Sequence, residues 1–468
     1  MAFCNKYVRN MLNISAIIAV LASCGPTPAW MQIGVKDEDA TTSQVSAPEV
    51  TQATVPDDPQ LTASIVNNSY LLSSVNLDSW LAAKNHGQTS TIAIFDNGFA
   101  GLSLALGKDL PANLSVEKPA IDNESKTPHG TVLAKIIFAM TSGSPKWTTA
   151  STHPKLKLYN TNGFTNLNAA VDQAIADHVD MIVYSQVWEF GGNFDGRGFI
   201  NVAVNKATAA GILWINAAGN YAASSWQGKL VANTERTAVL PYLGKYVRLV
   251  VKDASTKVKI SLSWNDFTDS KTWMTPRDLD LSLLDSNQKL VESSKKIQDG
   301  VDHDKNTAYS AHAREAIETT LEPGTYLIQV DLKSDNFDSA SSIRISADGL
   351  NISFTDIAEN ASVMIPADNP SVLTVGASDD SSSSYGTILD GNHKPEVAAP
   401  SLIEFQSGFA FSGSSTAAAV AAAALTVYQE ACGKMTRTAI VEKIKSGALS
   451  QQSTIGRGLW LPTGARCQ

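Results

Sequence analysis

The sequence predicts an α/β fold with a mostly parallel central sheet flanked by helices, interrupted by an all-β sandwich domain. Two changes of pattern along the chain predict it. From about residue 61, short β-branched runs alternate with stretches of helical spacing, which is typical of parallel strands joined by helices. At about residue 226 this alternation stops, and it returns at about residue 371.

In the two α/β parts, the strands are short apolar runs, and the helices repeat apolar residues at helical spacing. The expected strands are 91–95, 156–159, 179–184, 212–216 and 371–377. The expected helices are 131–140, 167–178, 199–210 and the alanine-rich stretch 416–430.

Between these parts the chain contains strand-like runs separated by turn residues. They are 248–251, 258–264, 279–284, 290–292, 316–321, 325–332, 342–346 and 352–354. Runs at such short spacing, without a helical pattern, favour a sandwich of two sheets. We therefore expect a first α/β part at 61–225, an inserted sandwich at 226–356 and a second α/β part with a C-terminal tail at 357–468.

The composition excludes several classes of protein. The 468 residues include 36 basic and 45 acidic ones, so the net charge is 36 − 45 = −9, and 43% are hydrophobic. So many apolar residues exclude a disordered acidic chain. The acidic balance argues against a nucleic-acid-binding protein, which would carry a basic surface. Past the N-terminus, no stretch reaches the roughly 18 apolar residues of a membrane span.

The N-terminus has the pattern of a processed export signal. Within residues 1–24, Lys6 and Arg9 precede a short apolar core. The core ends in Leu-Ala-Ser followed by Cys24, which resembles a bacterial lipobox, where the cysteine is lipidated. The alternative is an ordinary secretory signal. The polar stretch 25–60 is expected to be a flexible linker, so the mature chain would be tethered by lipid in the bacterial cell envelope.

The chain has four cysteines. Cys4 would be removed with the signal and Cys24 acylated, which leaves Cys432 and Cys467. In an oxidising compartment, two remaining thiols favour a disulfide that fixes the C-terminal tail. Two unpaired buried thiols are the alternative.

Two motifs at element ends carry an acid and a base. Asp96-Asn97-Gly98 directly follows the strand 91–95, so this carboxylate is positioned to orient an imidazole, although a turn aspartate before glycine is a commoner role. His129-Gly130-Thr131 opens a helix, and the glycine lets another segment approach the ring closely. Each motif alone is weak evidence.

Two further motifs carry an amide and a hydroxyl. Ala217-Ala218-Gly219-Asn220 follows a strand, so it is either a simple loop or the source of an amide that donates to an oxyanion. Ser412-Gly413-Ser414-Ser415 opens the alanine-rich helix, where serine is either an N-cap or a hydroxyl beside the positive end of the helix dipole.

Together, these motifs resemble the subtilisin-like serine peptidase family. The resemblance rests on the order Asp96, His129, Asn220, Ser415 and covers about 61–225 and 357–450. Further matching stretches are Val372-Leu373-Thr374-Val375-Gly376-Ala377 and Lys394-Pro395-Glu396-Val397-Ala398-Ala399-Pro400. A metallohydrolase is disfavoured, since no His-Glu-x-x-His or comparable ligand spacing occurs.

The resemblance implies a serine endopeptidase acting through an acyl-enzyme. Ser415 would be the nucleophile, His129 the general base, and Asp96 the group that orients the imidazole. Asn220 and the Ser415 N–H would form the oxyanion hole. Ser414 is the rival hydroxyl, but it stands where the family has threonine. The implied partners are protein or peptide substrates, with no nucleic acid, and we expect a monomer.

Ser185-Gln186-Val187 departs from the family pattern. Relatives have Ser-x-Gly on this substrate-binding strand, and a valine in place of glycine crowds the approach of a substrate backbone. Asn97 and Ala419 are milder departures. The altered substrate strand leaves open the alternative of a catalytically weak or inactive relative that acts as a surface binding protein through its sandwich domain.

No cofactor or metal is expected in the catalytic part. In the insertion, Asp278, Asp280 and Asp285 offer the hard oxygen ligands that calcium prefers, but alternating acidic residues on a strand are more often a solvated face.

Overall fold

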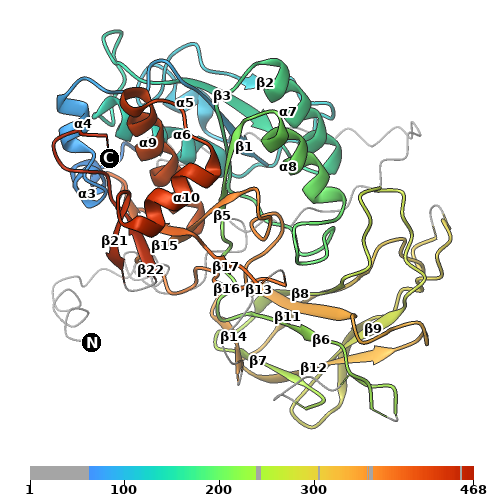
Figure 1. Ribbon diagram of the computed structural model, residues 1–468. Coiled ribbons are helices and arrows are strands. Elements are labelled where there is room, and N and C mark those ends of the chain that lie inside the picture. Colours follow the sequence, from blue (N-terminus) through green and yellow to red (C-terminus); the bar gives the residue numbers. More distant parts are fainter. Residues whose placement is uncertain are drawn as a thin grey trace, which may run out of the picture.

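The computed structural model describes residues 63–467 except 234, 239–243, 304–305, 356, 358–361, 390 and 454–455. Cys24, the predicted signal at 1–24 and the predicted linker at 25–60 therefore lie outside the described residues. The described chain forms a larger region of helices around a sheet and a smaller region of strands (Figure 1). No helix in these residues combines the length and apolar character needed to cross a bilayer.

A nine-stranded sheet forms the centre of the larger region, with the order β2-β3-β1-β4-β5-β15-β18-β22-β21. Neighbouring strands are parallel except for β22 and β21, which confirms the predicted mostly parallel sheet. The strands are β1 (Thr91–Asp96), β2 (Val116–Glu117), β3 (Lys155–Asn160), β4 (Met181–Tyr184), β5 (Leu213–Ala217), β15 (Leu373–Ala377), β18 (Val397–Ala399), β21 (Ser450–Ser453) and β22 (Gly456–Leu459).

Helices cover both faces of this sheet. They are α3 (Asn68–Ser74), α4 (Asp78–Ala82), α5 (Leu102–Ala105), α6 (His129–Ser142), α7 (Phe164–Ala176), α8 (Phe199–Ala209), α9 (Ser414–Cys432) and α10 (Arg437–Ser446). Successive strand side chains point to opposite faces. In β1, Ile92 and Ile94 share an apolar cluster with α6 and α9, whereas Ala93 and Phe95 belong to the cluster that contains α7 and α8. Burial on both faces explains why β1 is an uninterrupted apolar run.

The alanines of α9 set how closely this helix packs. From Thr416 to Tyr428 every residue of the helix is buried, and Ala417–Ala419 and Ala421–Ala424 belong to the same apolar cluster as α6. Alanine has the highest helix propensity, and its small side chain lets backbones approach. The first turn of α9, which contains Ser415, is therefore attached to a tightly packed helix.

Two antiparallel sheets form the smaller region. One has the order β10-β9-β12-β7-β14 and the other β11-β8-β13-β6. Their strands are β6 (Ser225–Lys229), β7 (Val247–Val251), β8 (Thr256–Trp264), β9 (Leu279–Leu284), β10 (Leu290–Ser294), β11 (Arg314–Leu321), β12 (Gly324–Leu332), β13 (Ser342–Gly349) and β14 (Ile352–Thr355). Short two-stranded ladders join β16 (Gly386–Thr387) to β17 (His393–Lys394) and β19 (Ile403–Glu404) to β20 (Ala410–Phe411). Apolar residues of both larger antiparallel sheets lie in one cluster with the residues of α7 and α8, so the two regions share a core.

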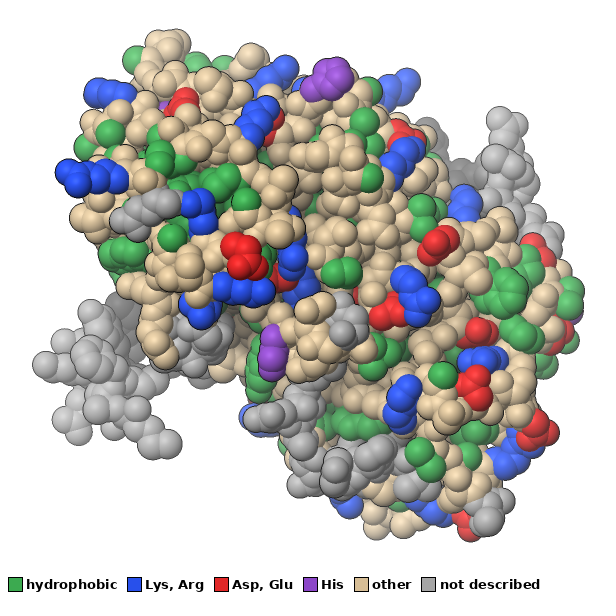
Figure 2. Space-filling view, in the orientation of Figure 1, with side chains coloured by type: hydrophobic (Ala, Val, Ile, Leu, Met, Phe, Trp, Pro, Cys, Tyr) green, Lys and Arg blue, Asp and Glu red, His purple; other side chains and the backbone are tan. Residues whose placement is uncertain are grey.

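A buried arginine joins the two regions. Arg344 on β13 is 1% exposed and donates to Oε1 of Gln227 at 2.6 Å and to the carbonyl of Val363 at 2.8 Å. Its guanidinium lies 4.4 Å from the ring centroid of Phe194, in the larger region. On the face shown in Figure 2, the surface continues without a break from one region to the other, with acidic and basic side chains interspersed.

A buried carboxyl group lies near this junction. Asp348 on β13 is 9% exposed and is the cross-strand partner of Lys259 on β8. Burial raises the pKa of Asp348 to about 8, and the carboxylate of Glu189 contributes to the increase. The native state therefore holds a proton on Asp348 at pH values where the unfolded chain does not.

We expect Asp348 to make stability depend on pH. Because the folded pKa is higher, the native state binds more protons than the unfolded state between the ordinary value of 3.8 and about 8, so the free energy of unfolding falls as pH rises through that window. Asp348→Asn should reduce this fall. Urea unfolding at about pH 5 and about pH 8 measures it. An identical fall in variant and wild type would contradict the assignment.

A disulfide and several hydrogen bonds attach the C-terminal tail to the larger region. A disulfide joins Cys432, the last residue of α9, to Cys467. The indole N–H of Trp80, in α4, donates to the carbonyl of Pro462 at 3.0 Å. The two predicted cysteines thus lie together.

The disulfide closes a loop of 35 residues, and a cross-link of that length stabilises a protein by about 2–4 kcal/mol by restricting the unfolded chain. We expect the double variant Cys432→Ser/Cys467→Ser to lose about this free energy of unfolding relative to the oxidised protein. Thiol titration of denatured, unreduced protein beginning at residue 25 should find no free thiol. Two titratable thiols would exclude the bridge.

Candidate active site

Asp96 and His129 form a buried pair at the carboxyl end of β1. Asp96 is the last residue of the strand and fully buried, while His129 is the first residue of α6 and 3% exposed. Nδ1 of His129 lies 2.5 Å from Oδ2 of Asp96, and Oδ1 of Asp96 accepts from the N–H of Gly98 at 3.2 Å. A carboxylate held in this way orients the imidazole ring and favours a proton on Nδ1.

Gly130 allows α6 to begin against this strand. A Cβ atom at position 130 would lie 2.4 Å from the ring of Phe99 and 2.8 Å from Cβ of Asp96, closer than real Cβ contacts. The pair therefore depends on a glycine directly after His129.

Ser415 lies at the same edge of the sheet. It is the second residue of α9 and half-buried. Its hydroxyl donates to the carbonyl of Ser185 at 3.2 Å, and the hydroxyl of Ser185 donates to the carbonyl of Ser415 at 3.3 Å. Ser185 directly follows β4, the parallel neighbour of β1, so both strands end at this edge. Within the part of the chain that the structure describes, the Ser415 hydroxyl does not hydrogen-bond to the His129 ring.

Asn220 follows β5, the next strand along, and contacts the start of α9. Its Oδ1 accepts from the N–H of Ser414 at 2.9 Å and from the Ser414 hydroxyl at 3.0 Å. Two donors on this oxygen fix the orientation of the amide, whose NH₂ group then points away from them. Gly413, with φ of 132°, makes room for it, because a Cβ there would lie 3.0 Å from Nδ2.

These residues lie within a segment that matches a known family. A family model described as the subtilase family, which is a family of peptidases, matches residues 87–458. The chain belongs to the subtilase family. A comparison with curated protein sequences gave no match.

Solved structures similar to this subtilase are distant. The CspB protease of Clostridium perfringens is 14% identical, with a TM-score of 0.47, covering 85% of this chain and 98% of that chain. The prenylagaramide maturation protease PagA is 13% identical, with a TM-score of 0.37 and coverage of 80% and 88%. The pre-peptidase C-terminal domain of collagenase from Bacillus anthracis is 14% identical over 27% of this chain and 89% of that chain, with a TM-score of 0.17.

Ser414, the rival hydroxyl of this subtilase, is 1% exposed. Its Oγ accepts from the N–H of Gly219 at 3.0 Å and donates to Oδ1 of Asn220. The hydroxyl is thus engaged with the segment after β5, and it fixes the side chain of Asn220.

The segment Ser185–Val187 contacts both the end of β1 and the start of α9. Nε2 of Gln186 is 3.5 Å from Oδ2 of Asp96, and Oε1 of Gln186 accepts from Nδ2 of Asn97 at 3.2 Å. Val187, the residue predicted to crowd a substrate backbone, is partly exposed. The predicted site residues are therefore brought to one edge of the sheet, joined by this segment.

Glu124 was not predicted from the sequence. Its Oε1 accepts from the N–H of Phe99 at 3.1 Å. Burial raises the pKa of Glu124; the Phe99 N–H opposes that rise, and the carboxylates of Asp122 and Asp96 add to it. Glu124 lies in a connection without regular secondary structure, where no periodic pattern singles out one carboxylate.

The three aspartates considered as calcium ligands do not form one cluster. Asp285 accepts from the N–H groups of Asn287 and Lys289 in a turn, whereas Asp280 pairs with Lys333 at 3.2 Å. Among the described residues, no group of three or more His, Cys, Asp or Glu side chains is arranged to hold a metal ion.

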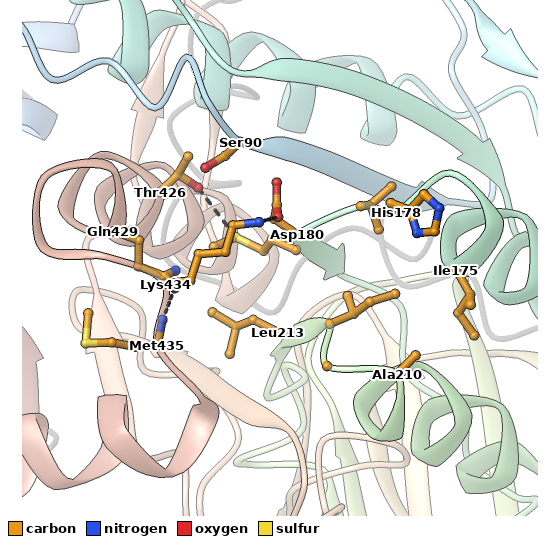
Figure 3. Close-up of a pocket in the computed structure, with 14 residues that line it drawn as sticks. Ser90, Ile175, His178, Asp180, Ala210, Leu213, Thr426, Gln429, Lys434 and Met435 are labelled. Atoms are coloured by element: carbon orange, nitrogen blue, oxygen red, sulfur yellow. Dashed lines mark hydrogen bonds and ion pairs between the residues drawn. The ribbon is translucent and has the colours of Figure 1, made fainter.

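A pocket of about 320 Å³ lies at the opposite edge of the sheet (Figure 3). It is lined by residues just before β4 and β5, such as Asp180 and Ile212, and by the end of α9. Lys434 extends across it to pair with Asp180, whose Oδ2 also accepts from the Thr91 N–H. The pocket is therefore at the amino ends of the strands, away from Asp96 and His129.

Gly130→Ala is expected to destabilise the protein by about 1–3 kcal/mol, because the added methyl group overpacks the contact between α6 and β1. Urea unfolding measures the loss. Gly324→Ala is the matched control, since a Cβ there would lie 3.7 Å from the nearest side chain, an ordinary contact. Equal stability of the two variants would show that α6 does not need to approach Asp96 this closely.

Proposed function

We propose that this subtilase is a serine endopeptidase that hydrolyses peptide bonds through an acyl-enzyme on Ser415. The 2.5 Å contact between His129 and Asp96 is the observation that carries the proposal. The buried carboxylate fixes the imidazole, and a half-buried serine at the same sheet edge supplies the third group. This set of groups can activate a hydroxyl.

In the proposed reaction, Nε2 of His129 accepts the Ser415 proton while Oγ attacks the substrate carbonyl. Asp96 stabilises the imidazolium, which then protonates the leaving amine, and water repeats the sequence to release the acid. The Ser415 hydroxyl must first turn from the Ser185 carbonyl towards the ring. Catalytic hydrogen bonds commonly tighten only when substrate binds.

Asn220 and the backbone N–H of Ser415 are proposed to stabilise the oxyanion. The Ser415 N–H lies in the first turn of α9, where N–H groups have no partner within the helix. The Ser414 contacts hold the Asn220 amide in one orientation, and a preorganised donor of this kind typically contributes about 2.7–4 kcal/mol to the transition state.

Residues Ser185–Val187 are proposed to receive the substrate backbone as an added strand. The contact of Ser185 with Ser415 supports this role. The two larger antiparallel sheets are proposed to be the inserted sandwich, supported by their common apolar cluster. The motif before Cys24 supports a lipid-anchored location in the bacterial envelope.

A binding protein of low or no catalytic activity is the second candidate. One observation and one implication of the family resemblance favour it: the Ser415 hydroxyl bonds to the Ser185 carbonyl, and Val187 stands where the resemblance implies glycine. In that case the antiparallel region would carry the binding surface.

A fluorophosphonate probe distinguishes the two candidates, because it reacts with an activated serine. We expect wild type and Ser412→Ala to be labelled and Ser415→Ala to remain unlabelled while folding normally by circular dichroism. Ser412 is a nearby control whose hydroxyl bonds to Asp380 instead. Labelling of Ser415→Ala would move the nucleophile elsewhere, and a folded, unlabelled wild type would favour the binding protein.

A further inference from the structure

The residues that follow Ser185–Val187 are held by the antiparallel region. Glu189 is 6% exposed, and its Oε2 accepts from Nζ of Lys259 at 2.6 Å. Lys259 lies on β8, between β11 and β13 in the four-stranded sheet. A largely buried ion pair therefore links that sheet to a residue four positions after Ser185.

Lys259 is surrounded by acidic groups. Its cross-strand partners are Glu318 on β11 and Asp348 on β13. Burial acts to lower the pKa of Lys259, but Glu189, Glu318 and Asp348 outweigh burial, so the pKa is raised. Lys259 is thus a stable cation that can hold Glu189 by charge as well as by its hydrogen bond.

Glu189 and Asp348 also lie near the segment that follows β5, which contains Asn220. Tyr221 follows Asn220 directly and is buried. Burial raises its pKa, and the carboxylates of Glu189 and Asp348 add to the increase, because both lie near it. The Glu189–Lys259 pair therefore lies near the segment that contains Asn220 and Tyr221 as well as near Ser185–Val187.

Hydrogen bonds and ring contacts also fix the residues that directly follow Ser185–Val187. The N–H of Trp188 donates to the carbonyl of Ile365 at 2.6 Å, and its indole donates to the hydroxyl of Tyr184 at 2.8 Å. Phe190 lies against the rings of Phe267 and His312, from the antiparallel region. Since β4 ends at Tyr184, residues 185–187 are a bridge between the parallel sheet on one side and these contacts on the other.

We propose that Lys259 is a positioning residue of the peptidase. Through Glu189 it keeps Ser185–Val187 in the position that a substrate backbone needs for strand pairing. The inference rests on the proposed function, and it gives the antiparallel region a role in binding extended peptides. A peptide pays less ordering entropy when its partner strand is already fixed.

The test separates peptide binding from the chemistry on Ser415. Removing Lys259 alone would leave the Glu189 charge buried without its partner, which can unfold a protein. We therefore choose the double variant Glu189→Gln/Lys259→Met, which removes both charges, together with Lys259→Arg, which keeps the cation. Lys257→Met is the matched control, because Lys257 is an exposed lysine on the same strand.

With an extended chromogenic peptide, we expect KM of the double variant to rise about tenfold or more while kcat changes less than about threefold, the pattern of lost binding without lost chemistry. Fluorophosphonate labelling should stay within about twofold of wild type, because the small probe makes no strand pairing. Lys259→Arg and Lys257→Met should keep KM near the wild-type value.

Three results would overturn the inference. An unchanged KM in the folded double variant overturns it while leaving the proposed function intact. A parallel fall of kcat and labelling, with KM unchanged, would assign the pair a general structural role instead. A wild type that is not labelled overturns the proposed function first, and the inference with it.

Discussion

The carboxylate of Asp96 is fully buried at the end of β1, and a buried charge is tolerated only when donors compensate for the lost water. The Gly98 N–H and the His129 ring supply those donors. This requirement places the start of α6 against the strand, makes a glycine necessary at position 130, and orients the imidazole. Because β1 and β4 are parallel neighbours, the same edge also receives Ser185, whose carbonyl holds the Ser415 hydroxyl.

The antiparallel region is an integral part of this arrangement. Its apolar residues continue the cluster beneath α7 and α8, so the larger region would lose part of its core without it. Arg344 and the Glu189–Lys259 pair add polar contacts at the junction. A large shared core argues against free relative motion of the two regions.

Much of this fold could be predicted from the sequence, because its strands are apolar runs buried on both faces. The predicted strand 279–284 coincides with β9, and the helix predicted at 416–430 lies within α9. Shorter elements such as α5, and α10 with its polar surface, lack a distinct period and were not predicted. Their conformation is set by packing against the rest of the chain.

For the site, residues named by motif were predicted, and contacts between distant segments were not. Asp96 and His129 are identified by their neighbours in sequence, and they pair in the structure. Ser415 and Ser185 are 230 residues apart in the sequence, and Glu189 and Lys259 are 70 residues apart. Such pairings depend on how the two regions pack, for which a single sequence contains no local pattern.

The buried alanines of α9 restrict which substitutions this helix can accept. Ser415 is carried by a helix whose buried face is mostly methyl groups, pressed between α6 and the sheet. Ala421 is fully buried six residues after Ser415, so a bulkier residue there would overpack the contacts of the helix. Substitution along α9 is therefore restricted by the packing of these alanines, although they lie outside the proposed catalytic groups.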